Sequence, residues 1–322
     1  MTVVPVTPAA AAGAEQNTEG LQNAVLDLGF ENSLEDSSGK GNNGTLSSGE
    51  AEYVDGVVGK GLKMNGSSYV NLGNSTDLQP ENLTLSFWIR PDSDMKGEEL
   101  ISWNKNEWYT DGWYLSSEND NTPLTLSVGP AKTNGQPYRV SVSGKRSEFL
   151  PTGEWTHIAV TYDKDSKEIC FYRNGVKCST VTTYGISGES TGVLGSDASM
   201  EKSIGYNGPK YKGAYLKASL DEYQLYNDVA TQEEVIALYE ESGQTFDRKA
   251  VAQADLDKIS IPETTQGNLS LPATGESGSV ISWSSDNEAV VAADGTVVRP
   301  GVGEKDATVT LTAEASYLNG EK

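Results

Sequence analysis

The stretch LTLSFWIRPD at residues 83–92 decides the fold class, because its apolar and polar side chains alternate up to a Pro-Asp turn. Alternation with a period of two is typical of a β-strand that has one face on a core. The same rhythm recurs in ELISWN (99–104), GWYLSS (112–117), YRVSVSG (138–144) and WTHIAVTYD (155–163). Many short alternating strands separated by turn signals predict an all-β protein with antiparallel sheets stacked as a sandwich or jelly roll.

One helix is predicted, in ATQEEVIALYEESG at 230–243. Thr231 and Glu234 have the spacing of a capping box, and Gly243 is a typical helix C-terminus. The helix closes the large domain, which we expect to cover residues 21–245.

A second series of short strands begins near residue 256, with Trp283 in its middle and an Asp-Gly turn at 294–295. Four or five such strands predict a small immunoglobulin-like sandwich over 256–322. We expect residues 246–255 to be a linker, and RKAVAQADLDKI (248–259) to be partly helical. Because a complete domain of this type needs one more strand, we also expect the gene product to continue past Lys322.

Charge is the strongest signal in the composition: the 322 residues include 46 acidic and 24 basic side chains, for a net charge of −22. This balance argues against binding to nucleic acids or anionic membranes, both of which require a basic surface. No apolar run is long enough to span a bilayer. Residues 1–20 contain AAAAGAE, which resembles a small-residue cleavage site, so we expect a signal-peptide remnant with a disordered leader and an exported protein.

The two cysteines flank an Asn174-Gly175 turn in KEICFYRNGVKCS. A type I turn with a glycine bulge would set Tyr172 opposite Val176, and therefore Cys170 opposite Cys178. In an exported protein, this pairing favours a disulfide between Cys170 and Cys178. The alternative is a pair of small, half-buried thiols.

Catalytic chemistry is not expected. The chain has one histidine, His157, and it lies in an alternating strand where a packed side chain is the favoured interpretation. Zinc sites are equally disfavoured with one histidine and two hairpin cysteines. The acidic clusters lie at loop or helix surfaces and nominate no pair of carboxylates for glycoside hydrolysis.

Clustered aromatic and amide side chains predict a site for sugars, because ring faces stack on sugar rings while polar groups bind hydroxyls. The richest stretch is WNKNEWYTDGWY at 103–114, and a second is GYNGPKYKGAY at 205–215. The candidates for carbohydrate binding are Trp108, Tyr109, Asp111, Tyr138, Arg139, Tyr206, Asn207 and Tyr211. For any single one of them, the alternative is an exposed surface residue that binds no ligand.

Several passages, in order along the chain, resemble the laminin-G-like, concanavalin A-like lectin-glucanase superfamily, to which pentraxins are related. They are GFENSLEDSSGKGNNGTL (29–46), VDGVVGKGLKMNGSSYVNL (54–72), LTLSFWIRPD, EWTHIAVTYD, CFYRNGVK and LDEYQLYNDVATQEEVIALYE. The tail SWSSDNEAVVAADGTVVRPGVGEKDATVTLTA resembles an atypical bacterial immunoglobulin-like domain of secreted glycoside hydrolases.

The resemblance implies a jelly-roll fold and a structural calcium ion held by Glu31, Asn43 and Asp221. In related families a glutamate and an aspartate at similar positions meet at one ion. The alternative is that Glu31 and Asp221 accept hydrogen bonds from backbone N–H groups. The resemblance also implies that the 103–114 and 205–215 loops approach each other.

We therefore expect a non-catalytic carbohydrate-binding module with an immunoglobulin-like spacer. It would be a monomer within a larger secreted bacterial glycoside hydrolase, directing a catalytic domain of the same chain to a polysaccharide or host glycan. The alternative is a structural or adhesive scaffold that has no sugar site and packs on a catalytic domain or another protein.

Overall fold

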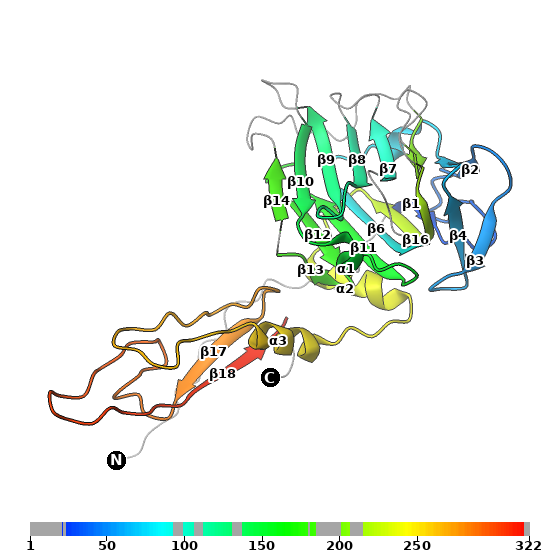
Figure 1. Ribbon diagram of the computed structural model, residues 1–322. Coiled ribbons are helices and arrows are strands. Elements are labelled where there is room, and N and C mark those ends of the chain that lie inside the picture. Colours follow the sequence, from blue (N-terminus) through cyan, green and yellow to red (C-terminus); the bar gives the residue numbers. More distant parts are fainter. Residues whose placement is uncertain are drawn as a thin grey trace, which may run out of the picture.

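The computed structural model describes residue 21 and residues 24–92, 99–105, 112–130, 137–179, 181–184, 201–206 and 215–318. They form a sandwich of two eight-stranded antiparallel sheets, followed by a smaller, elongated second domain (Figure 1). The expected all-β architecture with few helices is confirmed.

Sheet A has the strand order β13-β12-β11-β6-β16-β4-β3, and β1 pairs with β16 beside this path. Its central strand is β6, which lies between β11 and β16. The bounds are β1 (Ala24–Leu28), β3 (Glu52–Asp55), β4 (Lys60–Asn65), β6 (Leu83–Pro91), β11 (Thr156–Tyr162), β12 (Ile169–Arg173), β13 (Val176–Lys177) and β16 (Lys217–Tyr226).

Sheet B has the strand order β14-β10-β9-β8-β7-β15-β5-β2. The bounds are β2 (Thr45–Leu46), β5 (Val70–Asn71), β7 (Glu99–Lys105), β8 (Gly112–Ser117), β9 (Thr125–Pro130), β10 (Pro137–Val142), β14 (Val181–Tyr184) and β15 (Ser203–Ile204). Two short helical turns complete the sandwich, η1 (Thr76–Leu78) and α1 (Arg146–Phe149).

The core lies between the two sheets and follows from the alternation of the strands. In β6, Leu85 and Phe87 enter this core, whereas Ser86 lies on the opposite face of sheet A. From sheet B, Trp113 enters the same core and is 0% exposed. Each large apolar side chain buried in this way contributes roughly 1.5–3 kcal/mol to folding.

Helix α2 (Gln232–Glu241) covers part of the outer face of sheet A, where its Val235 packs with Ala159 and Tyr172. The predicted capping box is present: the Thr231 side chain accepts from the backbone N–H of Glu234, and the Glu234 carboxylate accepts from that of Thr231. The predicted helix is therefore confirmed, with its N-terminus at the predicted cap.

The second domain contains an antiparallel pair, β17 (Val280–Ser285) and β18 (Leu311–Ser316). The expected sandwich had four or five strands. In the described part of the domain, the β17–β18 pair is the one regular strand pair. One isolated bridge adds Thr274 to Val280 of β17, and a second links Val291 to Val297 outside the pair. Pro300, Gly301 and Gly303 occupy the segment before β18, and residues of these types interrupt regular strands.

The expected linker at 246–255 is for the most part a helix, α3 (Arg248–Asp257). Asp247 caps its N-terminus by accepting from the backbone N–H of Ala250 at 2.9 Å. Ala252 and Asp255 are buried against the second domain, so α3 is an integral part of that domain. The helical signal was present in the sequence, but tertiary contacts were needed to make this segment structural.

The predicted disulfide between Cys170 and Cys178 is wrong, because both cysteines are free. Asn174 and Gly175 have positive φ angles of 48° and 80° and form a two-residue turn that pairs Tyr172 with Lys177. This register differs by one residue from the expected one. Since a one-residue slip moves a side chain to the other face, Cys170 packs outside sheet A and Cys178 contacts the core between the sheets.

Candidate functional site

Five of the eight predicted carbohydrate-binding residues lie outside the described residues. They are Trp108, Tyr109, Asp111, Asn207 and Tyr211. The structure places the other three, Tyr138, Arg139 and Tyr206, in three different environments.

Tyr206 belongs to an aromatic cluster with Tyr69 and Tyr215. Its ring centroid lies 4.9 Å from that of Tyr69 and 4.5 Å from that of Tyr215, and the outer two centroids are 6.5 Å apart. The planes are inclined by 26°, 8° and 29°, so the three rings are offset and nearly parallel. Tyr206 is 7% exposed, and the other two rings are half-buried.

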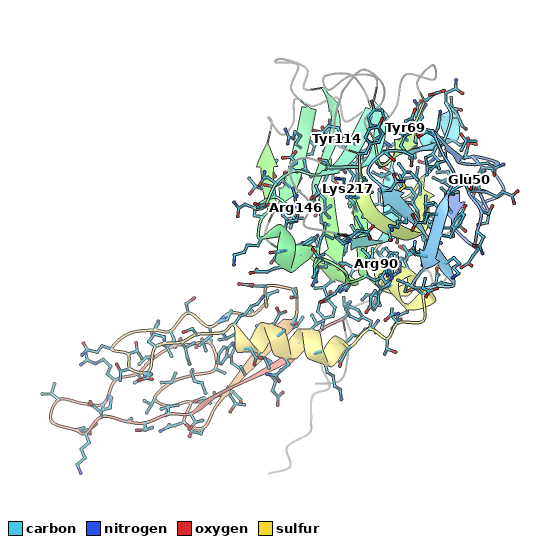
Figure 2. All side chains as sticks on the ribbon, turned by 45° about the vertical axis from the view of Figure 1, so that its right-hand side comes forward. Glu50, Tyr69, Arg90, Tyr114, Arg146 and Lys217 are labelled. Carbon is cyan, nitrogen blue, oxygen red and sulfur yellow. The ribbon has the colours of Figure 1, made fainter. Side chains whose placement is uncertain are left out.

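Three separate strand ends bring this tyrosine cluster together. Tyr69 precedes β5, Tyr206 follows β15, and Tyr215 precedes β16. Gly205 has a φ of 86°, which lets the chain turn sharply after β15, and the Tyr206 carbonyl accepts from the Ser203 hydroxyl at 2.5 Å. Figure 2 shows Tyr69 at the end of the sandwich away from the second domain.

The tyrosine cluster combines apolar ring surface with neutral hydroxyl groups. Burial raises the pKa of Tyr69, and the Glu201 carboxylate raises it further. Burial also raises the pKa of Tyr206. The phenols of Tyr69 and Tyr206 therefore keep their protons at neutral pH, and a phenol hydroxyl can both donate and accept hydrogen bonds.

Tyr138 and Arg139 are adjacent on β10 and point to opposite faces of sheet B. Tyr138 shares the parity of Val140 and lies in the core between the sheets, 8% exposed, so its predicted sugar contact is wrong. Arg139 lies on the outer face and forms an ion pair with Glu118. Strand parity decided the face of sheet B on which each of the two side chains lies.

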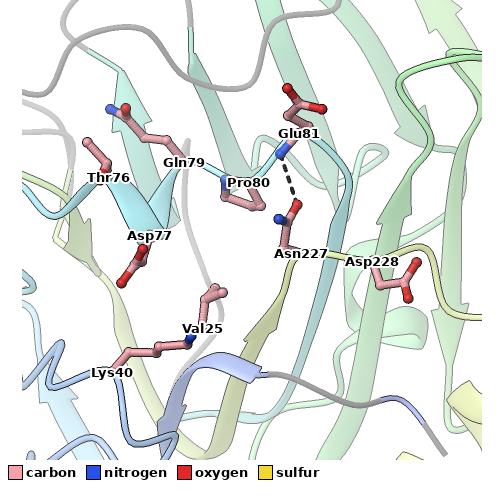
Figure 3. A pocket seen from close by; sticks show the side chains of 9 residues that line it. All are labelled: Val25, Lys40, Thr76, Asp77, Gln79, Pro80, Glu81, Asn227 and Asp228. Carbon is pink, nitrogen blue, oxygen red and sulfur yellow. Dashed lines mark hydrogen bonds between the residues drawn. The ribbon is translucent and has the colours of Figure 1, made fainter.

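A polar cavity of about 390 Å³ lies where β1 begins and β16 ends, beside η1 (Figure 3). Asn227 is held there because its side-chain oxygen accepts from the backbone N–H groups of Glu81, at 3.0 Å, and Asn82, at 3.4 Å. The polar residues that line the cavity include Lys40, Asp77, Gln79, Glu81, Asn227 and Asp228. The sequence contained no signal for this cavity, because its walls come from segments far apart in the chain.

Two of the three predicted calcium ligands meet at the turn between β3 and β4. The Asp221 carboxylate accepts from the backbone N–H groups of Val57 and Val58 at 2.7 and 3.0 Å. Glu31 accepts from the backbone N–H of Lys60 at 3.0 Å. These are the hydrogen bonds that the alternative interpretation expects.

The third predicted ligand, Asn43, accepts from the backbone N–H of Asp36 at 2.8 Å. Calcium requires six to eight oxygen ligands. Across the described ranges, no group of three or more His, Cys, Asp or Glu side chains is placed to hold a metal ion. Calcium binding stays a prediction.

Carboxylates gather near Asp221. Burial raises the pKa of Asp221 to about 6, although its backbone hydrogen bonds act in the opposite direction. Burial and the Asp221 charge raise the pKa of Glu222 to about 7, with smaller contributions from Asp27, Glu31 and Glu241. Mutual repulsion in a desolvated group is the physical cause.

His157 is a packed strand residue, as expected. It is 1% exposed and shares a 2.9 Å hydrogen bond with the Ser86 hydroxyl. Its ring lies 5.3 Å from that of Trp88 and 5.7 Å from that of Tyr239. Burial lowers its pKa to about 3, so the imidazole is neutral at physiological pH.

Comparison with known families agrees with this geometry. Residues 64–236, more than half of the chain, match the concanavalin A-like lectin/glucanases superfamily. The chain belongs to this superfamily. Residues 249–321 match the atrophied bacterial Ig domain, which agrees with the reduced strand pairing of the second domain.

The chain is also similar to several solved structures. The binding domain of Paraclostridial Mosquitocidal Protein 1 has a TM-score of 0.50 and 22% identity, covering 68% of this chain and 52% of that chain. A structure of botulinum neurotoxin type C has a TM-score of 0.50 and 16% identity, covering 69% of this chain and 50% of that chain. Domain 4 of AbnA, an extracellular arabinanase from Geobacillus stearothermophilus, has a TM-score of 0.47 and 22% identity, covering 69% of this chain and 100% of that chain.

The likenesses to the two toxin structures show the fold. The chain spans about half the length of the two toxin structures. No curated protein sequence matches the chain. None of the helices within the described ranges combines the length and apolar character that crossing a membrane requires.

Proposed function

We propose that residues 21–245 are a non-catalytic carbohydrate-binding module and that the second domain is its spacer within a larger secreted bacterial glycoside hydrolase. The observation that carries the proposal is the cluster of Tyr69, Tyr206 and Tyr215 at the strand ends of a concanavalin A-like sandwich. Fold membership alone assigns no ligand, so the proposal depends on this cluster.

The chemistry of the tyrosine cluster suits a sugar. Aromatic faces pack against the C–H face of a pyranose or furanose ring, and the half-buried Tyr69 and Tyr215 retain exposed surface for this contact. Their hydroxyl groups can form hydrogen bonds with sugar oxygens. Botulinum neurotoxin type C, which shares the fold, enters cells through interaction with two ganglioside molecules, which supports glycan binding as a use of this architecture.

The net charge of −22 narrows the ligand class. Glu201 lies close enough to Tyr69 to raise its pKa, so the tyrosine cluster also has a negative neighbour. Negative potential repels polymers rich in uronic acid or sulfate. The proposed ligand is therefore a neutral polysaccharide or a neutral part of a host glycan.

The experiment is isothermal titration calorimetry of the intact chain against neutral plant, microbial and mucin oligosaccharides. We expect Tyr69→Ala and Tyr215→Ala each to weaken binding at least fivefold, which corresponds to roughly 1 kcal/mol of lost stacking. Tyr53→Ala is the matched control, because Tyr53 is also half-buried but lies on β3. Binding that none of the tyrosine variants changes would contradict the proposed site.

The polar cavity of Figure 3 is the competing location for a sugar. Its lining includes carboxylate and amide groups and no aromatic side chain, so it would contact sugar edges and not ring faces. If Asp77→Asn abolished sugar binding and Tyr69→Ala left it unchanged, the sugar site would be this cavity and not the tyrosine cluster. No binding to any glycan would overturn the proposed function itself.

A second candidate function is that of a protein-docking scaffold. It is favoured by three valines exposed on the second domain, Val280 at 65%, Val298 at 58% and Val302, which is fully exposed. Exposed apolar side chains favour contacts with proteins where they form a contiguous patch, which this alternative requires of the three valines. Under this alternative, Val280→Lys would weaken association with a catalytic domain of the same full-length protein, and the tyrosine variants would have no effect.

A further inference from the structure

The turn Asn174–Gly175 is anchored firmly to the sandwich. Asn174 exchanges two hydrogen bonds with His157 of β11: its side-chain oxygen accepts from the His157 N–H, and its own N–H donates to the His157 carbonyl, both at 2.9 Å. The Gly175 carbonyl accepts from the Gln232 side chain of α2 at 2.6 Å. The turn therefore holds a fixed position on the sandwich.

Phe246 packs directly on this turn. A Cβ atom added to Gly175 would lie 2.8 Å from two ring carbons of Phe246, closer than such contacts occur in proteins. Phe246 lies in the segment between α2 and α3, and it is 8% exposed. The absence of a side chain at position 175 is thus what allows the ring to approach.

Phe246 also joins the two domains through an aromatic series. Its ring lies 6.3 Å from Tyr239 of α2 and 6.0 Å from Tyr317, which follows β18. Tyr239 in turn stacks on Trp88 of the central strand β6 at 5.5 Å. A continuous series of rings therefore runs from sheet A into the second domain.

The surrounding side chains extend the same contact. Ile236 of α2 shares a buried apolar cluster with Ile281 and Ala315 of the β17–β18 pair. The guanidinium of Arg248 in α3 pairs with Glu233 of α2 at 2.8 Å and lies 5.6 Å from the Phe246 ring. The junction is thus apolar at its centre and has an ion pair at its edge.

The junction is bordered by open space on one side. Beside it, a cavity of about 390 Å³ separates the β12–β13 hairpin from the loop at 274–278 of the second domain. A single substitution at the turn should therefore release the junction without disturbing either domain.

We infer that the sandwich and the second domain are one rigid body, locked where Phe246 packs on the Gly175 turn. The second domain is then a fixed arm, which sets the orientation of the sandwich relative to whatever is attached beyond that domain. This inference rests on contacts within the chain and does not depend on sugar binding.

The experiment is ¹⁵N relaxation by NMR on the intact chain, which reports a rotational correlation time for each domain. We expect one shared correlation time in the unsubstituted chain. Gly175→Ala should give the second domain a shorter time than the sandwich, because the new Cβ expels the Phe246 ring.

Gly153→Ala is the matched control. Gly153 has a φ of 79°, against 80° for Gly175, but an added Cβ would meet nothing within 4 Å. Both substitutions therefore introduce the same backbone strain, and only one disturbs the junction. Gly153→Ala should keep one shared time.

Phe246→Ala provides a second route to the same result, because it removes the ring and leaves the turn intact. If Gly175→Ala fails to fold, Phe246→Ala decides the matter alone by separating the two correlation times. Two distinct times in the unsubstituted chain, or one shared time in both Gly175→Ala and Phe246→Ala, would overturn the inference.

Discussion

At the scale of the residue, the strand pattern predicted that His157 is packed, but it did not predict how completely the ring is desolvated. Alternation in WTHIAVTYD predicted a packed side chain, and the structure confirms it at 1% exposure. The extent of desolvation depended on α2, whose Tyr239 lies against the ring. That contact joins residues 82 positions apart and could not be inferred from the local pattern.

Burial makes His157 a source of acid sensitivity. Its pKa falls from the ordinary value of 6.5 to about 3 in the folded chain, so between these values the unfolded chain binds a proton that the folded chain does not. The contribution of His157 to stability therefore falls as the pH drops through this window, by about 2 kcal/mol between pH 7 and pH 5. The raised pKa values of Asp221 and Glu222 act in the opposite direction, but they are common to the unsubstituted chain and to His157→Gln. Urea unfolding of both proteins at both pH values should therefore show that the stability of the unsubstituted chain relative to His157→Gln falls by about 2 kcal/mol from pH 7 to pH 5. A difference between the two proteins that does not change with pH would contradict the prediction.

At the scale of elements, the turn type of the β12–β13 hairpin decided on which faces of the sheet Cys170 and Cys178 lie. An Asn-Gly pair suits both a two-residue turn and a turn with a bulge, so the sequence left the register open by one residue. The structure pairs Tyr172 with Lys177, which separates Cys170 and Cys178 onto opposite faces. The same two-residue turn presents Gly175 to Phe246, so the register that excludes the disulfide also forms the junction between the domains.

Helix α3 depends on one buried carboxylate. Asp255 is 1% exposed and accepts from the backbone N–H groups of Ser277 and Ser279 at 2.9 and 3.2 Å. Burial alone would raise its pKa, but the hydrogen bonds from these serines hold it below the usual value. Asp255→Ala leaves two N–H groups without their acceptor, so we expect a loss of roughly 2–3 kcal/mol in the unfolding free energy of the second domain.

The control for this prediction is Asp257→Ala on the same helix. Asp257 is exposed, and within helix α3 it accepts a hydrogen bond from the Gln253 side chain at 2.8 Å. Its loss should cost less than about 0.5 kcal/mol. Urea unfolding followed by the amide signals of the second domain compares the two variants, and equal effects would show that Asp255 does not hold the loop.

For the whole molecule, charge opposes compactness. A net charge of −22 makes the folded chain repel itself, and the Debye length falls from about 10 Å at 0.1 M salt to about 3 Å at 1 M. We expect the melting temperature to rise by a few degrees between 20 mM and 500 mM NaCl. A melting temperature that stays level or falls would show that self-repulsion is unimportant.

The predicted calcium ion is tested by comparing CaCl₂ with NaCl at matched ionic strength. A larger rise in melting temperature with CaCl₂, abolished in Asp221→Asn, would support calcium at Glu31 and Asp221.

The sequence by itself determined the all-β class, the two domains and helix α2, because strand alternation and helix capping are short-range properties written into residues such as Leu83–Pro91 and Thr231. It also nominated Tyr206 for the candidate site. Only the tertiary structure decided that Tyr69 and Tyr215 join Tyr206, that Tyr138 faces the core, and that Phe246 packs on Gly175. The physical reason is that these contacts depend on strand register and on segments that meet across the fold, and a shift of one residue redirects every side chain of a strand.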